Sequence, residues 1–203
     1  YFALEVGADN VTLDLNGHKI SGTRDLAGVV FSGRDNVKII GNGGVISGFW
    51  VGVNTSESDF LQVQSTSFYD LAVGVIVSSG SNAMIKKNDF IQLSSQGVSI
   101  INYVEGLVAN NNTINDNEFF KTRVGIEVCG DNSDGNRITN NLIWLNSDYG
   151  INLIRSDRNK LYGNRILDSS TSAIRLADSS LNRIHGNSLQ MGRVGLVIAA
   201  RVG

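Results

Sequence analysis

Apolar and polar residues alternate along the chain in short runs that recur at nearly constant intervals. Segments with the pattern Asn-x-Ile/Leu-x-x-Asn-x-Ile/Leu begin at Asn136, Asn159 and Asn182, at intervals of 23 residues. A second pattern, a small residue followed by apolar-x-apolar, comes after each segment, as at 125–128 and 150–153. Each repeat is therefore predicted to contain three short strands of period-2 alternation, and helical periodicity is missing.

A fixed period of this length predicts a solenoid in which coils stack and each sequence position forms a column. The last apolar position of the pattern can be traced backwards with small slips, at Ile20, Ile46, Phe68, Phe90, Phe119, Ile143, Ile166 and Leu189. About eight coils of roughly 22–29 residues result. The expected fold is all-β, a single-stranded right-handed parallel β-helix, with residues 1–203 in one domain.

The second polar position of the pattern is asparagine in the last five coils, at Asn88, Asn117, Asn141, Asn164 and Asn187. An asparagine chosen for chemistry would not recur in every coil. Its amide can bond the turn backbone and the asparagine of the next coil, for a net of about 0.5–1.5 kcal/mol each. We therefore expect a structural role for this column.

Composition narrows the class of protein. With 41% apolar and 18% charged residues, the 203-residue chain is suited to a folded soluble domain. Its net charge of −2 gives no general attraction to nucleic acid. Apolar runs are too short for a membrane span. The single cysteine, Cys129, is expected to be a small buried residue without a disulfide.

Both ends of the chain consist of strand-like sequence, Tyr1 to Leu4 and Gly195 to Ile198, and no signal peptide precedes the first. The chain is therefore expected to be part of a longer solenoid. Coils that end a solenoid leave backbone donors and acceptors unpaired, so end-to-end or oligomeric association is an expectation.

The repeat closely resembles the right-handed parallel β-helix proteins of the pectate-lyase-like superfamily. Segments such as 9–18 (DNVTLDLNGH) and 35–41 (DNVKIIG) are similar to those of its carbohydrate-binding proteins and sugar hydrolases. The resemblance implies an extracellular or periplasmic location and a substrate groove on an outer face. It leaves the activity open, because lyases, hydrolases, epimerases, phage tailspikes, adhesins and maturation factors share this fold.

The first candidate site is a column of residues that face solvent in the second pattern. The column contains Ile76, Ser99, Glu127, Asn152, Arg175 and Val197. In a uronate-processing site Arg175 and Arg155 would neutralise a sugar carboxylate, Asn152 would bind the sugar, and Glu127 would accept the adjacent carbon-bound proton. The alternative is a surface ladder in which Glu127 and Arg175 only balance charge.

Sequence around Glu127 supports a binding side at this position. The coil before it is longer than most, with 29 residues from Phe90 to Phe119, and insertions in repeats tend to mark the binding face. Its flanking charges include Lys121 and Arg123 on one side and Asp131 and Asp134 on the other. We include Lys121 and Arg123 among the expected substrate-binding residues.

The second candidate site comes from the asparagine pattern. Its outward positions stack Arg137, Lys160 and Arg183, with Thr139, Tyr162 and His185 beside them. Three like charges in register repel by roughly 1 kcal/mol per pair in water. Lys160, Tyr162, Arg183 and His185 could together bind an acidic polysaccharide. Long basic side chains on a solenoid also prevent aggregation, and that alternative stays open.

Metal and cofactor chemistry has little support. Two histidines and one cysteine make a soft-metal cluster improbable, so a copper role of the kind that periplasmic maturation β-helices suggest gains no support. Residues 131–135 (DNSDG) have the oxygen density of a calcium site without the established spacings. No cofactor is predicted, with calcium as the alternative.

Two classes of function follow. The first is a polysaccharide-active β-helix that acts on an acidic, uronate-containing glycan as lyase, epimerase or hydrolase. The second is a non-catalytic carbohydrate-binding or structural module of a larger surface protein, adhesin or tailspike. Missing catalytic signatures favour the second class: the paired aspartates of polygalacturonases are not found, and a chain without proline has no Asp-Pro-His of alginate epimerases. The enzyme assignment stays open.

Overall fold

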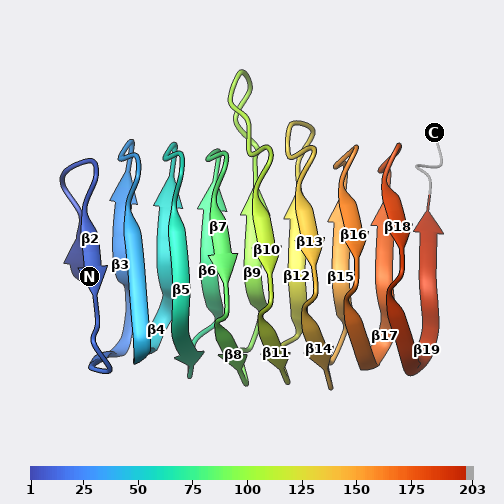
Figure 1. The fold of residues 1–203 in the computed structure, drawn as a ribbon, viewed down its shortest axis with the longest axis horizontal. Coiled ribbons are helices and arrows are strands. Elements are labelled where there is room, and N and C mark those ends of the chain that lie inside the picture. The colour runs from blue at the N-terminus through green and yellow to red at the C-terminus, as the bar shows by residue number, and fades with distance from the viewer. Residues whose placement is uncertain (200–203) are drawn as a thin grey trace.

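The structure, a computed structural model, describes residues 1–199 and is a parallel β-solenoid of about nine turns (Figure 1). This confirms the predicted fold class, although the structure has about nine turns where the sequence pattern predicted about eight. No helix capable of crossing a membrane occurs among residues 1–199. The strands are Phe2–Glu5 (β1), Thr12–Asp14 (β2), Lys19–Ser32 (β3), Lys38–Ser56 (β4), Gln62–Tyr69 (β5), Val73–Ser78 (β6), Met84–Lys86 (β7), Asp89–Ile91 (β8), Gln96–Ile101 (β9), Thr113–Asn115 (β10), Glu118–Phe120 (β11), Val124–Cys129 (β12), Arg137–Thr139 (β13), Leu142–Trp144 (β14), Tyr149–Ile154 (β15), Lys160–Tyr162 (β16), Arg165–Ala177 (β17), Arg183–His185 (β18) and Ser188–Ala199 (β19).

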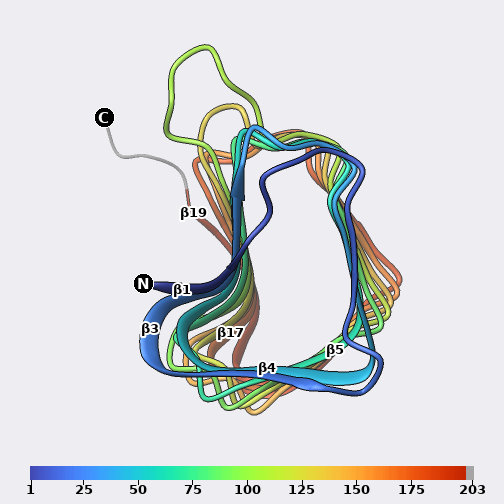
Figure 2. The same ribbon diagram turned by 90° about the vertical axis from the view of Figure 1, so that its left-hand side faces the viewer.

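Each regular turn contributes one strand to each of three faces, and Figure 2 shows these faces end-on. The first face contains β6, β9, β12 and β15; the second contains β7, β10, β13, β16 and β18; the third contains β8, β11 and β14. In the outer turns the longer strands β3, β4, β5, β17 and β19 continue around a corner between faces. All pairs are parallel, because the same segment of each turn lies beside its counterpart in the next.

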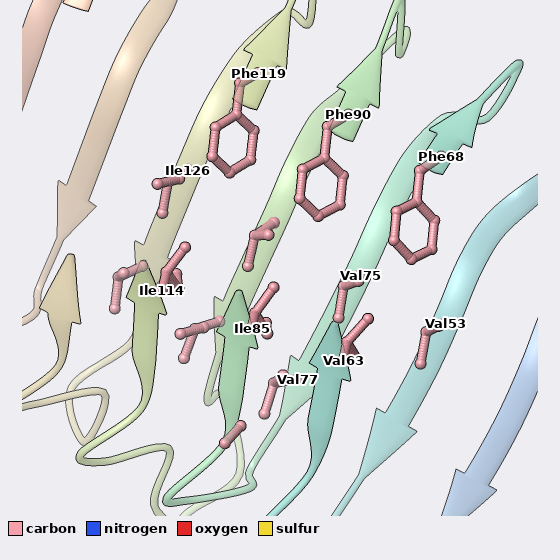
Figure 3. Close-up of a cluster of buried hydrophobic side chains, with 14 of the residues drawn as sticks. Val53, Val63, Phe68, Val75, Val77, Ile85, Phe90, Ile114, Phe119 and Ile126 are labelled. Carbon is pink, nitrogen blue, oxygen red and sulfur yellow. The ribbon is translucent and has the colours of Figure 1, made fainter. Parts of the chain in front are cut away.

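Inward side chains stack like on like along the solenoid and form one core (Figure 3). Phe68, Phe90 and Phe119 are fully buried, and their rings stack with centroids 5.0 and 4.8 Å apart and planes within 6°. Glycine is the second residue of each first-face strand for a steric reason. A Cβ on Gly97 would lie 2.3 Å from the Phe119 ring, so a side chain there would displace the stack.

The expected asparagine column is a buried ladder at the corner between the second and third faces. Asn88, Asn117, Asn141 and Asn164 are each at most 2% exposed. The backbone N–H and the amide Nδ2 of Asn117 both donate to Asn141 Oδ1, at 3.0 and 3.1 Å, and Asn141 repeats both bonds to Asn164 Oδ1. A second ladder runs from Asn112 through Asn136 and Asn159 to Asn182. The structural role is confirmed.

The extra residues of the long coil form a loop between β9 and β10. It projects beyond the other turns in Figure 1. Asn102 fixes its base, because its Nδ2 donates to Leu107 O at 2.7 Å and its Oδ1 accepts from Val104 N at 3.2 Å. Tyr103, Val104 and Val108 in the loop are exposed.

Candidate functional site

The expected column on the first face is present in the strand pairing, but Ser99 and Asn152 in it are only 5% and 3% exposed, so the expectation that these two residues face solvent is wrong. Glu127 pairs with Ser99 on one side and Asn152 on the other, and Asn152 pairs with Arg175. Hydrogen bonds join these side chains. Arg175 Nη1 donates to Asn152 Oδ1 at 3.1 Å, and Asn152 Nδ2 donates to Glu127 Oε2 at 3.0 Å. The side chain of Asn152 therefore connects the two charges.

The second oxygen of Glu127 also has a donor. Gln96 Nε2 donates to Glu127 Oε1 at 3.0 Å, and Ser95 Oγ donates to Gln96 Oε1 at 2.6 Å. The guanidinium of Arg175 lies 5.4 Å from the centre of the Tyr149 ring. We call Gln96, Glu127, Asn152 and Arg175 the polar ladder. Hydrogen bonds already satisfy one or more polar atoms of each member, so the ladder is held in one arrangement.

An open cleft of about 410 Å³ lies at the base of the long loop. Its walls come from three turns: Tyr103 and Glu105 from the loop, Asp131 and Asn132 after β12, and Arg155 after β15. Arg155 Nε is 3.7 Å from Asp131 Oδ1, and both side chains are largely open to solvent. An ion pair this long and this exposed contributes little to stability, so these groups are available to a ligand.

Tyr103 closes the inner side of this cleft over a buried thiol. Its Oη lies 3.0 Å from Cys129 Sγ, and the hydrogen bond raises the pKa of Tyr103 to about 12, with partial burial adding to the effect. Cys129 is only 4% exposed and belongs to no disulfide, as expected from the sequence. It does not point into the core, because it lies two residues after Glu127 on the outer side of β12.

Lys121 and Arg123 lie at the opposite end of β12 from Asp131. Lys121 follows β11, and its Nζ is 5.1 Å from the centre of the Phe120 ring. Both side chains are exposed, but neither lines the cleft. Arg155, in contrast, is part of the cleft wall. The expected substrate-binding residues on this face therefore fall into two separate groups.

The basic column on the second face is in the expected register. Arg137 pairs with Lys160 and Lys160 with Arg183, and all three side chains are exposed. Within residues 1–199 the ion pairs are Arg155–Asp131 and Arg158–Asp134, so these three cations have no acidic partner there. We call Arg137, Lys160 and Arg183 the basic ladder.

An aromatic pair lies beside the basic ladder. The rings of Tyr162 and His185 stack with centroids 5.3 Å apart and planes within 6°. Tyr162 is partly exposed and His185 is exposed. Thr139, the third expected neighbour, is only 4% exposed. The exposed surface beside the basic ladder therefore comes from Tyr162 and His185 and not from Thr139.

The structure offers no preformed metal site in its described part. Residues 1–199 contain no group of three or more His, Cys, Asp or Glu side chains placed to hold a metal ion. Asp134, from the calcium-like segment, accepts a hydrogen bond from Asp157 N at 2.7 Å through Oδ1, and its Oδ2 is 3.6 Å from Arg158. These contacts use the carboxylate to join neighbouring turns.

Sequence reasoning missed Gln96 and Tyr149 on the first face and Tyr103 in the long loop beside it. Gln96 and Tyr149 begin first-face strands, one residue before the glycine, in the column next to Glu127. That column is visible in the repeat, but its residue types differ from turn to turn, so the repeat does not indicate a shared role. Tyr103 carries the stronger signal, because it is the aromatic residue of the long coil.

Comparison with solved structures confirms the architecture. The chain is 21% identical to a point mutant of the periplasmic alginate epimerase AlgG, with a TM-score of 0.61. The superposition covers 79% of this chain and 38% of the epimerase chain. A second AlgG structure is 17% identical, with a TM-score of 0.60 and coverage of 86% and 55%. The Streptococcus pneumoniae surface protein and adhesin PfbA is 14% identical, with a TM-score of 0.63 and coverage of 95% and 67%.

These likenesses concern the fold, since the identities are low and the chain spans 38% and 55% of the two epimerase structures. No curated protein matches the sequence. A family model described as periplasmic copper-binding protein (NosD) matches residues 36–202. The periplasmic location in that description agrees with the extracellular or periplasmic location expected from the sequence. The match extends over most of the chain, and the protein therefore belongs to the NosD family.

Proposed function

We propose that this chain is a non-catalytic binding module that holds an acidic polysaccharide along the basic ladder of its second face. The observation that carries the proposal is the register of Arg137, Lys160 and Arg183, three exposed cations without an acidic partner among residues 1–199. Neighbouring strands of a sheet are about 4.8 Å apart, so the charges form a regular row.

Electrostatics explains why a polyanion would bind there. Two like charges at strand spacing repel by roughly 1 kcal/mol in water. A chain of uronate carboxylates that lies along the row would replace this repulsion with attraction, and several weak contacts act together on one polymer. Tyr162 and His185, whose rings stack on each other beside the row, supply partly exposed aromatic surface for contact with the apolar side of a sugar.

The copper in the family description does not enter this proposal. Copper favours thiolate, thioether and imidazole ligands. In this chain Cys129 is buried beneath Tyr103, and His185 stacks on Tyr162. Residues 1–199 contain no group of three or more His, Cys, Asp or Glu side chains placed to hold a metal ion, so the imidazole and thiol groups of this part of the chain do not form a copper centre.

The test is binding to alginate and polygalacturonate, measured by calorimetry at low and high salt. Lys160→Glu reverses the central charge of the basic ladder and should weaken binding about tenfold or more, equivalent to at least about 1.4 kcal/mol. Lys38→Glu is the matched control, because Lys38 belongs to the same column but lies four turns from Arg137, the nearest member of the basic ladder. Its partners in the adjacent turns, Thr12 and Gln62, are uncharged. Equal losses in the two variants, or none, would contradict the proposal.

Catalysis on the first face is the second candidate, favoured by the cleft whose walls follow β12 and β15, the strands of Glu127 and Asn152; no member of the polar ladder lines this cleft. Glu127 would remove the carbon-bound proton of a uronate and Arg175 would neutralise its carboxylate. Gln96 and Asn152 each donate to one oxygen of the Glu127 carboxylate, so the carbon-bound proton of a sugar would have to reach the lone pairs that these bonds leave free. The amides therefore count against this candidate.

Assays for unsaturated product, reducing ends and proton exchange on the same glycans separate the two candidates. An enzyme should lose its activity in Glu127→Gln and keep it in Ser99→Ala, a change in the same column one turn away. If the unaltered chain binds the glycan but shows no activity in any of the three assays, the catalytic candidate is ruled out.

A further inference from the structure

The outer side of the third face carries a continuous row of large apolar side chains. Strand pairing places one in each of five successive turns, at Tyr69, Ile91, Phe120, Trp144 and Leu167. We call this row the apolar strip. Its members alternate with inward core residues such as Phe119 and Ile143, and all remain partly open to solvent. Leu145, beside Trp144, is 40% exposed and widens the strip.

The rings of the strip are held in place by neighbouring side chains. Phe120 and Trp144 have ring centroids 4.2 Å apart at an angle of 32°. Trp144 Nε1 donates to Glu118 Oε1 at 3.1 Å, which fixes the orientation of the indole. At the other end Lys19 Nζ donates to Tyr69 Oη at 2.6 Å. Phe120 and Trp144 each cover one face of the other, so a ligand would contact the exposed edges of rings that are already ordered and would lose little affinity to their ordering.

An open hollow of about 420 Å³ adjoins the strip at the corner with the second face. It shares Glu118 and Leu142 with the region around Trp144, and its other walls include Asp89, Asp116 and Lys87. Three carboxylates therefore face one ammonium group. None of the three forms an ion pair within residues 1–199, although Asp89 accepts from Ser67 and Asp116 from Asn115.

These charges select among ligands. Asp89, Asp116 and Glu118 outnumber the two nearby cations, Lys87 in the hollow and Lys121 over the Phe120 ring, so the balance of charge repels an acidic sugar. A neutral sugar presents hydroxyl donors, and ionised carboxylates have several lone pairs each to accept them. Its apolar ring face matches aromatic side chains, which combine a large flat area with few rotatable bonds. The strip and the hollow together are thus complementary to an uncharged polyhydroxylated chain.

We propose that the apolar strip and the adjoining hollow bind a neutral glycan, whose apolar sugar faces pack on the exposed edges of Phe120 and Trp144 while its hydroxyls donate to Asp89 and Glu118. This surface is separate from the basic ladder and has the opposite charge. The inference therefore goes beyond the acidic-glycan proposal and does not depend on it. A chain with both surfaces would connect two kinds of polysaccharide.

Tryptophan fluorescence provides a direct test. The chain has two tryptophans, and Trp50→Phe leaves Trp144 as the single reporter. Cellohexaose, mannohexaose and dextran are titrated into this variant, with polygalacturonate as the acidic comparison. At least one neutral glycan should give a saturable change in Trp144 emission, reversed by dilution. No response to any of the three would overturn the proposal.

Substitutions locate the binding and separate the two proposals. In calorimetry with the responsive neutral glycan, Trp144→Ala should reduce affinity about tenfold or more, as loss of a stacking ring does. Trp50→Phe should leave it unchanged. Lys160→Glu should leave neutral binding intact, and Trp144→Ala should leave alginate binding intact. Neutral binding that survives Trp144→Ala would refute the assignment of this surface.

Folding and self-association are controlled in parallel. Circular dichroism and the unfolding transition of Trp144→Ala establish that it is folded. Leu145→Ser, an exposed change beside the ring, is a second variant that should weaken neutral binding without touching the core. A concentration-dependent dimer in sedimentation that Trp144→Ala abolishes would mean that a second copy covers the strip, and would also overturn the proposal.

Discussion

Asparagine side chains join successive turns at the scale of single residues. In the ladder at the corner of the second and third faces, Asn141 Oδ1 accepts two bonds from Asn117, and its Nδ2 donates to Ile114 O. Every polar atom of this buried amide is therefore used. The interval of 23 residues predicted this arrangement, because identical side chains in register can meet only their own kind.

Replacing Asn141 with alanine should leave the N–H of Asn117 and the C=O of Ile114 without their partners. Unsatisfied buried groups cost about 1–3 kcal/mol each, so we expect the free energy of unfolding to fall by at least about 2 kcal/mol in urea titrations. Asn132→Ala, an exposed asparagine outside both ladders, should change it by less than about 0.5 kcal/mol. Similar values for both variants would contradict a structural ladder.

The Tyr103 phenol makes a residue-scale prediction about pH. Its pKa is raised to about 12 by the hydrogen bond to Cys129, above the ordinary value of 10.0. A raised folded pKa means that the contact stabilises the folded chain fully below pH 10 and loses this effect as pH rises towards 12. The stability difference between the unaltered chain and Tyr103→Phe should therefore be smaller at pH 11 than at pH 8.

Ultraviolet titration of the phenols checks the same assignment independently. Tyr103→Phe should remove the component that ionises at the highest pH and leave the lower part of the curve unchanged. A curve that loses its lower part instead would show that the phenol is not held by the thiol.

At the scale of strands, register could be predicted and loop conformation could not. The pairing of Glu127 with Asn152 and of Lys160 with Arg183 follows from the repeat, since equal coil lengths put equivalent positions side by side. Tyr103 has no counterpart in other coils, so no pattern could indicate that it folds back onto Cys129. The amide contact of Gln96 with Glu127 is diagonal and depends on rotamers, which the alternation of strands does not determine.

The phenylalanine stack tests packing between strands. Phe90 is fully buried between Phe68 and Phe119, so Phe90→Ala leaves a cavity that rigid neighbouring strands cannot close. The expected loss is about 3–5 kcal/mol, measured as a shift of the urea midpoint at constant slope. Val108→Ala in the exposed loop is the comparison and should have almost no effect.

At the scale of the whole molecule, each turn is bonded to two neighbours, while the long loop stands outside this pairing. Its deletion is therefore expected to be tolerated. Replacing residues 103–108 with two glycines should lower the free energy of unfolding by about 1–3 kcal/mol, through the lost Tyr103 bond and the loss of Leu107 O as partner of the buried Asn102 amide. Cys129 should become reactive towards thiol reagents in the folded protein.

A matched deletion gives the contrast. Replacing residues 137–142, which contain β13 and the first residue of β14, with two glycines should abolish cooperative unfolding, because every later turn would lose its register. If the loop deletion unfolds the chain equally, then the loop is an integral part of the solenoid and the cleft is not a separable feature.

The solenoid scale also explains why fold was easier to predict than function. Every coil carries the same pattern of apolar and polar residues, so the sequence indicates the fold many times. A functional site depends on residues that differ from this pattern and occur only once. The basic ladder is an exception, since Arg137, Lys160 and Arg183 repeat a charge. The apolar strip repeats apolar character, but its residue types differ, and Trp144 alone gave no indication of the row around it.

Constant stacking distance has a consequence for any polymer that lies along the axis. Strand spacing is set by backbone hydrogen bonds and cannot adjust to a ligand, so the turns act as the divisions of a rigid ruler. A polymer whose repeat length matches the spacing of the turns can contact every turn. A polymer with a different repeat length loses register with the turns after a few units. Chain periodicity, rather than the chemistry of one sugar, would then decide how many turns a bound polymer occupies.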